Sequence, residues 1–128
     1  MKKCKTICRI SVKTGTADGD LFKILLSEGF KGKVMRVDPG LTVYSLNDGT
    51  ILELYGPGAC YPEHLFKSTS VVIGFKVEDI KKMILKMQNS GAILLGNVEM
   101  VCNTLIYCHL KLKNETVIGL YQDLLPGY

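Results

Sequence analysis

Thiols and imidazoles are the side chains of this sequence best suited to ligate a soft metal ion. The chain holds five cysteines and two histidines, and the tightest groupings are Cys4-x-x-x-Cys8 and Cys108-His109. None of these spacings matches a common zinc-binding pattern, and no C-x-x-C pair is present. Because free cysteine is among the most buried residue types, we expect most of the thiols to pack as small apolar groups. The odd number of cysteines also favours reduced thiols.

Length and composition are those of a single globular domain. The chain has 128 residues, of which 47% are hydrophobic and 22% are charged, so disorder is not expected. No apolar run approaches the roughly 20 residues of a membrane span. The basic N-terminus leads into an alternating segment rather than an apolar one, so we expect a cytoplasmic protein without membrane contacts. The net charge of +4 is spread along the chain, and nucleic acid is not an expected partner.

The first half of the chain predicts one strand, one helix and three short strands. Alternating apolar and polar residues predict the first strand over 6–13. Apolar residues at helical spacing then follow Asp18 and Asp20, which offer N-cap oxygens, and Gly29 ends the helix. Turn residues separate three further strand candidates, which lie at 32–37, 41–46 and 50–55.

The second half repeats this order. An apolar strand at 71–77 precedes Glu78-Asp79, whose negative charge suits the start of a helix. Four apolar residues then recur at helical spacing opposite a row of lysines, and Gly91 follows them. These four residues are Ile80, Met83, Ile84 and Met87. Three more strand candidates complete the chain, at 92–100, 104–112 and 116–122.

Two copies of a βαβββ module therefore account for the chain. The last strands of the two copies match, because Ile51-Leu52-Glu53-Leu54-Tyr55 aligns with Val117-Ile118-Gly119-Leu120-Tyr121. We predict an α+β fold in a single domain, 1–128. Its parts are module one at about 5–56, a linker at about 57–70 and module two at about 71–122. His64 lies within the linker, and we expect it at the surface.

This organisation resembles the vicinal oxygen chelate superfamily, which includes glyoxalase I, bleomycin-resistance proteins, extradiol dioxygenases and fosfomycin-resistance enzymes. The resemblance implies that the two modules form a curled mixed sheet around a cleft, and that two chains form a homodimer. It does not by itself imply one activity, because the superfamily hosts several chemistries and many binding proteins. The segments that carry the resemblance are 74–80, Gly91-Ala92, 114–122 and its first-half counterpart 47–55.

In metal-dependent members of this superfamily, each module supplies one ligand from its first strand and one carboxylate from its last. Transferred to this chain, the first-strand positions are Ile7 and Val72, and the last-strand positions are Glu53 and Gly119. Only Glu53 carries a donor atom, and one carboxylate does not hold a catalytic divalent ion. The resemblance therefore implies a protein without a metal cofactor, and it argues against glyoxalase I and dioxygenase activity.

Alternation along the strands predicts which side chains face the implied cleft. If the first-strand positions face inward, the same parity brings charged, polar and aromatic residues from five strands into the cleft. The assignment on the penultimate strand, which carries Tyr107 and His109, would be reversed by a β-bulge. The predicted ligand-binding residues are Arg9, Ser11, Glu53, Tyr55, Lys76, Tyr107, His109 and Tyr121.

These residue types suit a mixed polar and aromatic binding site. Arg9 and Lys76 could bind an anionic group, and the tyrosines could stack on a planar ligand. Glu53 and His109 are the candidate catalytic residues, as a proton-transfer pair. In the alternative interpretation, Glu53 pairs with Arg9 inside the cleft, His109 is only hydrogen-bonded, and the tyrosines fill space.

Three functions are compatible with this pattern. The first is a metal-independent protein of the bleomycin-resistance type, which binds a small organic molecule in the cleft. The second is a glyoxalase-like lyase or isomerase that uses an atypical metal site or the Glu53–His109 pair. The third is a sensor that passes ligand occupancy to a partner, although a chain of one domain carries no obvious output segment.

Overall fold

The computed structural model describes residues 7–29 and 32–124, which form eight strands and two helices. The first module contains β1 (Ile7–Lys13), α1 (Ala17–Gly29), β2 (Lys33–Asp38), β3 (Leu41–Ser45) and β4 (Ile51–Tyr55). The second contains β5 (Val71–Lys76), α2 (Ile80–Asn89), β6 (Ile93–Val101), β7 (Leu105–Lys111) and β8 (Val117–Asp123). The predicted order of elements is therefore confirmed. Neither helix of this part of the chain is long and apolar enough to cross a membrane.

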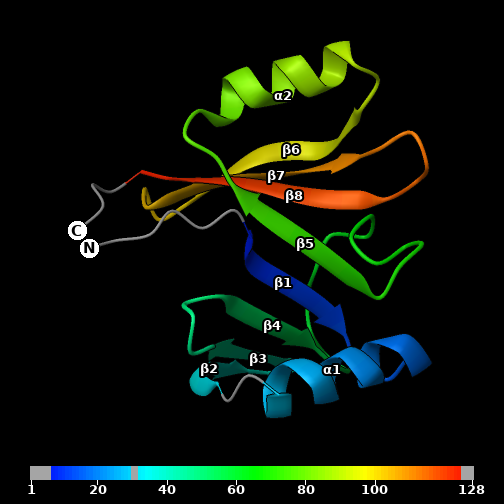
Figure 1. The fold of residues 1–128 in the computed structure, drawn as a ribbon, viewed down its shortest axis with the longest axis vertical. Helices are drawn as coiled ribbons and strands as arrows, with labels where there is room; N and C mark the ends of the chain where they lie inside the picture. The colour runs from blue at the N-terminus through cyan, green and yellow to red at the C-terminus, as the bar shows by residue number, and fades with distance from the viewer. Residues whose placement is uncertain (1–6, 30–31, 125–128) are drawn as a thin grey trace.

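All eight described strands form one mixed sheet in the order β2-β3-β4-β1-β5-β8-β7-β6. Within each module the first strand pairs parallel with the last, β1 with β4 and β5 with β8. The modules join where β1 and β5 pair antiparallel. Figure 1 shows the two helices at opposite ends of the molecule, with β1 and β5 crossing between them. The predicted α+β fold, with two tandem βαβββ modules in a curled mixed sheet, is confirmed, and the sheet is not closed.

Helix α1 does not begin at the predicted cap. Its N-cap acceptor is Thr16 Oγ1, which accepts a hydrogen bond from the backbone N–H of Gly19 at 3.0 Å. The prediction that Asp18 or Asp20 caps this helix is wrong, because both lie inside it. Asp20 Oδ1 instead accepts from the N–H of Gly15 in the preceding turn, at 2.8 Å. The two carboxylates still place negative charge in the first turn, where the helix dipole favours it.

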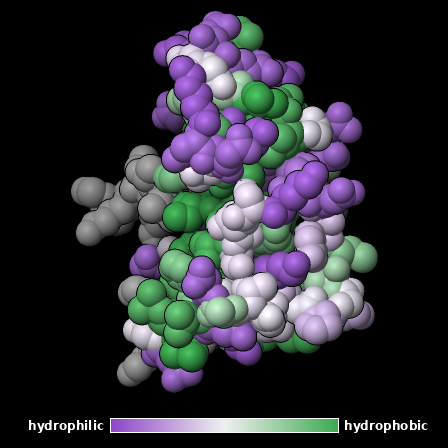
Figure 2. Space-filling view, turned by 90° about the vertical axis from the view of Figure 1, so that its right-hand side faces the viewer, coloured by the Kyte–Doolittle hydropathy of each residue, from purple (hydrophilic) through white to green (hydrophobic). Residues whose placement is uncertain are grey.

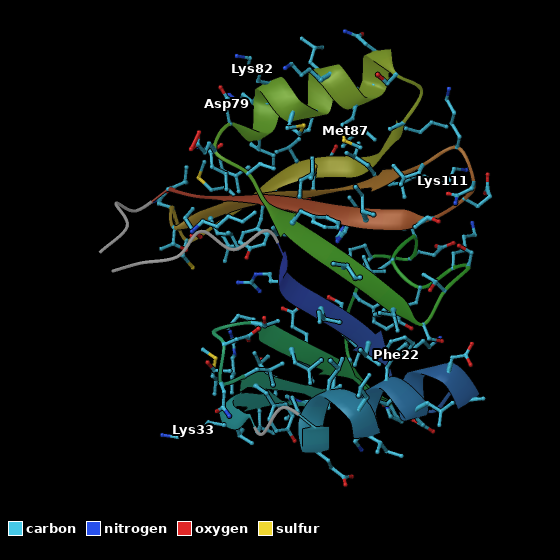
Figure 3. The ribbon with its side chains drawn as sticks, in the orientation of Figure 1. Phe22, Lys33, Asp79, Lys82, Met87 and Lys111 are labelled. Atoms are coloured by element: carbon cyan, nitrogen blue, oxygen red, sulfur yellow. The ribbon has the colours of Figure 1, made fainter. Side chains whose placement is uncertain are left out.

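Helix α2 begins as predicted and packs on its module. The Asp79 side chain is the N-cap and accepts from the N–H of Lys82 at 3.1 Å (Figure 3). Ile80 and Ile84 are buried against the sheet, and Met87 packs beside them from the same face of the helix. The apolar face predicted from the sequence is therefore the face that covers β6, β7 and β8.

Helix α1 covers its half of the sheet less completely. Leu26 is its one buried hydrophobic side chain among those described, whereas its other apolar residues and those of the edge strand β2 are exposed. Figure 2 shows hydrophilic side chains over the end that carries α2, and hydrophobic ones gathered at the opposite end. The exposed residues of α1 and β2 are Leu21, Phe22, Ile24, Leu25, Val34, Met35 and Val37.

The linker is held to the first module by a close backbone contact at Gly40. This residue has a φ of +78°, and its carbonyl oxygen accepts from the N–H of Gly56 at 2.6 Å. A Cβ at Gly40 would overlap backbone atoms of Pro57 and Ala59. We therefore expect Gly40→Ala to lower the free energy of unfolding by about 2 kcal/mol, measured by urea denaturation.

The matched control for this substitution is Gly58→Ala. Gly58 has a similar φ of +88°, but apart from its chain neighbours no heavy atom of the described residues lies within 4 Å of the position its Cβ would take. The control should show only the backbone cost of the left-handed conformation, about 1 kcal/mol. Equal losses in the two variants would contradict the role of the Gly40 contact.

Candidate functional site

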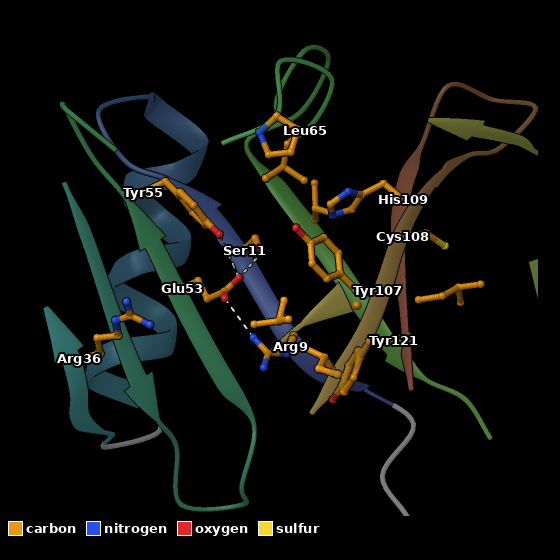
Figure 4. Close-up of a pocket in the computed structure, with 16 residues that line it drawn as sticks. Arg9, Ser11, Arg36, Glu53, Tyr55, Leu65, Tyr107, Cys108, His109 and Tyr121 are labelled. Atoms are coloured by element: carbon orange, nitrogen blue, oxygen red, sulfur yellow. Dashed lines mark hydrogen bonds and ion pairs between the residues drawn. The ribbon is translucent and has the colours of Figure 1, made fainter. Parts of the chain in front are cut away.

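A pocket of about 330 Å³ lies between the two modules (Figure 4). Its walls come from β1, β4, β5, β7 and β8, with further residues from β2, the linker and the β6–β7 hairpin. Most of the residues that strand parity assigned to the cleft do line this pocket. Their roles in binding stay predictions. Of the predicted residues, those that line the pocket are Arg9, Ser11, Glu53, Tyr55, Tyr107, His109 and Tyr121.

The Glu53 carboxylate on β4 is the centre of a hydrogen-bond network. Arg9 Nη1 donates to its Oε2 at 3.1 Å, in an ion pair. Ser11 Oγ and Tyr55 Oη both donate to its Oε1, at 2.8 and 3.2 Å. The strand register explains why these side chains lie together, because Ser11 pairs directly with Glu53 across β1 and β4. The predicted alternative, in which Arg9 pairs with Glu53 inside the cleft, is confirmed.

Arg9 spans the pocket from this carboxylate to Tyr121. Its guanidinium carbon lies 5.4 Å from the centre of the Tyr121 ring, within the range of a cation–π contact. The Arg9 charge therefore already interacts with the Glu53 carboxylate on one side and with the Tyr121 ring on the other. The Arg9 Nε atom is buried and has no hydrogen-bond partner among the described residues.

Lys76 does not line the pocket, contrary to the prediction. It is the last residue of β5, and its Nζ lies 3.0 Å from Asp123 Oδ2, with both side chains about half exposed. The parity argument failed because the strand leaves the pocket between Gly74, which lines it, and Lys76. A different cation, Arg36 of β2, borders the pocket and forms an exposed ion pair with Asp38 at 2.9 Å.

The structure brings His109 to His64 rather than to Glu53. His109 Nδ1 and His64 Nε2 are 3.2 Å apart, which is a hydrogen-bond distance. His64, expected at the surface, is only partly exposed, because its side chain contacts β7. Figure 4 shows Glu53 and His109 on opposite sides of the pocket with Tyr107 between them. The described residues thus do not form the predicted Glu53–His109 pair.

Burial shapes the ionisation of the groups in the pocket. Burial, and then the neighbouring His64, lower the pKa of His109 from 6.5 to about 4, so its imidazole is neutral at neutral pH. Burial, and then the Glu53 carboxylate, raise the pKa of Tyr55 far above its ordinary value. The pKa of Tyr107 is also raised, first by burial and then by the negative charges of Glu99 and Glu53. The pocket therefore presents neutral phenols and a neutral imidazole.

The linker supplies a wall that the strand pattern did not predict. Pro62 and Leu65 line the pocket, and Leu65 is 3% exposed. Tyr61 and Phe66 contact the ring of Tyr55 edge-to-face, which fastens the linker to β4. The adjacent apolar pair Leu65-Phe66 is the sequence signal for this packing, because a solvated linker rarely carries two neighbouring large apolar residues.

The residues at the positions of the superfamily's metal ligands do not fit a metal ion. The Val72 side chain is apolar and 2% exposed, Gly119 has no side chain, and the carboxylate of Glu53 already accepts from three donors. The side chain of Ile7, the fourth position, lies outside the described part. Within 7–29 and 32–124, no three His, Cys, Asp or Glu side chains lie close enough to share an ion.

The cysteines are less buried than expected. Cys108 is buried in the core of the second module, but Cys60 and Cys102 are exposed. Cys4 and the Cys8 side chain lie outside the described part of the chain. For the three described thiols, the expectation of predominant burial is therefore wrong. Cys60 follows the Gly-Pro-Gly turn of the linker, and Cys102 lies in the turn between β6 and β7. Both positions are exposed to water.

This difference predicts selective alkylation of the native protein. Burial raises the pKa of the Cys108 thiol to about 11, which lowers its thiolate population at pH 8. We expect iodoacetamide to modify Cys60 and Cys102 about 100-fold faster than Cys108, as followed by peptide mass mapping. Unfolding in urea should equalise the rates. A native Cys108 that reacts as fast as Cys60 would contradict its burial.

Comparisons with known proteins identify the fold. The sequence matches no protein-family model and no curated protein. Among solved structures, a hypothetical protein from Bacillus halodurans C-125 aligns over 98% of this chain and 99% of its own, with 13% identity and a TM-score of 0.64. A glyoxalase/bleomycin resistance protein/dioxygenase superfamily member from Vibrio splendidus 12B01 aligns over 91% and 97%, with 16% identity and a TM-score of 0.59.

Methylmalonyl-CoA epimerase from Mycobacterium tuberculosis shares the same architecture. It aligns over 94% of this chain and 89% of its own, with 10% identity and a TM-score of 0.62. The chain therefore has the glyoxalase/bleomycin-resistance fold of the vicinal oxygen chelate proteins, as its repeat organisation indicated. At these identities the likeness concerns the fold, and the function has to be argued from the pocket.

Proposed function

We propose that this protein binds a small, flat organic molecule in the pocket between its modules, and that it does so without a metal ion. The observation that carries the proposal is the pocket's lining. Three tyrosines and a neutral imidazole surround a cavity whose volume lies in the range of small-molecule sites. Aromatic side chains recognise flat ligands by stacking and keep a polar atom for a hydrogen bond.

The charges of the pocket favour an uncharged ligand. Arg9 is paired with Glu53, and Arg36 is paired with Asp38. A charged ligand would have to break one of these pairs and would leave the released partner without its counter-charge. The earlier expectation of an anionic ligand rested on Arg9 and Lys76, and Lys76 lies outside the pocket. Among the described residues that line the pocket, the uncharged groups that remain for a ligand include the hydroxyls of Tyr107 and Tyr121 and one nitrogen of His109, and the Arg9 Nε–H is also without a partner.

A matched set of probes tests this proposal. Benzamide, benzoate and benzamidine share a shape but are neutral, anionic and cationic. We expect the neutral probe to raise the melting temperature most, equally with and without EDTA, and zinc, nickel and manganese alone to have no effect. Tyr107→Leu should weaken benzamide binding by up to about tenfold. Preferential binding of benzoate would contradict the charge argument, and a chelator-sensitive shift would contradict metal independence.

The second candidate function is a lyase or isomerase with this fold. Methylmalonyl-CoA epimerases from Mycobacterium tuberculosis and Streptomyces coelicolor are among the solved structures that this chain resembles. One feature of the pocket supports this candidate, namely the neutral His109 at its wall in contact with a second imidazole. The Glu53–His109 pair does not, because the two side chains lie apart.

A homodimer is the remaining expectation, and size-exclusion chromatography with light scattering checks it. We expect the mass of two chains at micromolar concentration. A monomer under these conditions would overturn the expectation without affecting the binding proposal, because every residue used there comes from one chain.

A further inference from the structure

The fold brings together both histidines of the chain. His64 lies in the linker and His109 on β7, 45 residues apart in sequence, and their ring centres are 5.2 Å apart. Imidazole is the side chain that most often transfers protons in proteins. This pair is not used in the proposed binding function beyond the one nitrogen of His109.

The orientation of the His109 ring gives its two nitrogens different surroundings. Nδ1 faces His64 Nε2 at 3.2 Å. On the opposite edge, Cδ2 lies 3.5 Å from the position of a Cβ at Gly119, so this edge rests over β8. Nε2 is the ring nitrogen that does not contact His64, and the His109 side chain lines the pocket.

The edge of the His64 ring away from His109 lies beside β6. Its Cε1 and Nδ1 lie 3.0 and 3.6 Å from the position of a Cβ at Gly96, which is an exposed residue of β6. Gly96 has a φ of +68° and no side chain, and this leaves room for the imidazole. Because His64 is partly exposed and Gly96 beside it is exposed, the two rings lead from the pocket wall toward the surface.

The other groups around His109 do not compete for its proton. The residues that pair with it across the sheet are Leu95 on β6 and Gly119 on β8, and neither titrates. On its own strand, the Tyr107 ring lies 5.8 Å away and its phenol stays neutral. His64 is the single titratable group within hydrogen-bond distance of His109 in the described residues.

We propose that His109 and His64 form a proton relay, in which His109 removes a proton from an acidic C–H or O–H group of a molecule in the pocket and His64 delivers it to water. The relay rests on the proposed binding function, since the molecule must first enter the pocket. The relay uses the tautomers in which His109 Nδ1–H donates to His64 Nε2 and His64 Nδ1 carries a proton. The proton taken up at His109 Nε2 is balanced by transfer of the Nδ1 proton to His64 Nε2, and His64 then releases its own Nδ1 proton to water. After the product leaves, water removes the proton from His109 Nε2 and returns one to His64 Nδ1, which restores the starting tautomers.

A nitrobenzisoxazole is a suitable probe, because it is flat, uncharged and reports on one proton transfer. Removal of its ring C–H proton breaks the N–O bond and gives a coloured cyanonitrophenolate, with no other reactant. The relay predicts catalysed ring opening by the wild-type protein at pH 7. His109→Gln should lower kcat/KM by about 100-fold, and His64→Gln, which keeps the base but removes its outlet, by roughly tenfold.

The control moves the imidazole elsewhere. In the double variant His109→Gln with Gln88→His, the histidine count is restored on the exposed face of α2, and the rate should stay at the level of His109→Gln. Recovery of the rate in this variant would show that any imidazole suffices and would overturn the relay. An unchanged rate in His64→Gln would also overturn it, because His109 would then act alone.

Binding is measured separately with nitrobenzotriazole, a flat analogue that cannot open its ring. Stabilisation by this analogue, together with ring-opening rates equal in wild type and His109→Gln, would overturn the relay and leave the binding function intact. If neither this analogue nor the benzamide series changes the melting temperature, the binding proposal fails and the relay fails with it.

Discussion

Replacing Glu53 with glutamine is expected to lower the free energy of unfolding by about 3 kcal/mol, because the change leaves the Arg9 charge without its counter-ion inside the pocket. Glu53 is 17% exposed and Arg9 34%, so water can only partly solvate the released guanidinium. The substitution keeps the volume of the side chain. It also places an amide where Arg9, Ser11 and Tyr55 all donate, and an amide has a single oxygen to accept these bonds.

Urea denaturation of the variant measures this loss, and the chain offers a matched control. Lys76 and Asp123 form an ion pair of nearly the same length, 3.0 Å, with both side chains about half exposed. Asp123→Asn should therefore cost less than about 1 kcal/mol. The double variant Arg9→Met with Glu53→Gln should recover part of the loss, since it removes both charges. Similar losses at Glu53 and Asp123 would show that burial adds nothing to the Arg9 pair.

Acidification is expected to destabilise the protein by about 3 kcal/mol through His109 alone. The pKa of this residue is about 4 in the folded protein and 6.5 in the unfolded chain. Below pH 6.5 the unfolded chain binds a proton that the folded protein excludes, so stability falls with pH. The loss is complete near pH 4, where the folded protein also binds the proton. Above pH 6.5 both states are neutral, and His109 contributes no pH dependence.

Unfolding curves collected between pH 7 and pH 4.5 test this expectation by comparison with His109→Gln. Carboxylates titrate in the same range in both proteins, so the difference between the two curves isolates the histidine. We expect the wild-type protein to lose stability relative to His109→Gln as the pH falls. A difference that stays constant with pH would show that His109 is hydrated in the folded protein.

The fold was accessible from the sequence because each module repeats the same local signals. The Asp79 cap and the apolar face that includes Ile80 predicted α2, and turn residues separated the strands. The start of α1 was missed for a local reason. Thr16 competes with two nearby aspartates, and the sequence alone does not tell which oxygen meets a free N–H. The Thr16 hydroxyl also lies 2.8 Å from Ser70 Oγ, a long-range contact that the local pattern does not contain.

The site was accessible only where strand parity decides the direction of a side chain. Parity placed Arg9, Glu53 and Tyr121 in one pocket although they lie far apart along the chain. It failed at Lys76, because parity gives the face of a strand and not where the pocket ends. It could not reach His64, since a linker has no alternation, and its contact with β7 is a long-range one.

The two modules repeat the same backbone but contribute different side chains to the pocket. At matched positions of their last strands, β4 carries Glu53 with its three donors, whereas β8 carries Gly119, which pairs across the sheet with Gly74. One half of the pocket is therefore lined by charged side chains. The other half is lined by the backbone of Gly74 and by aromatic side chains. A ligand turned by half a revolution about the axis that relates the modules would meet different chemistry. The pocket is therefore not two-fold symmetric despite the repeat, and it should hold an asymmetric ligand in one orientation rather than in two.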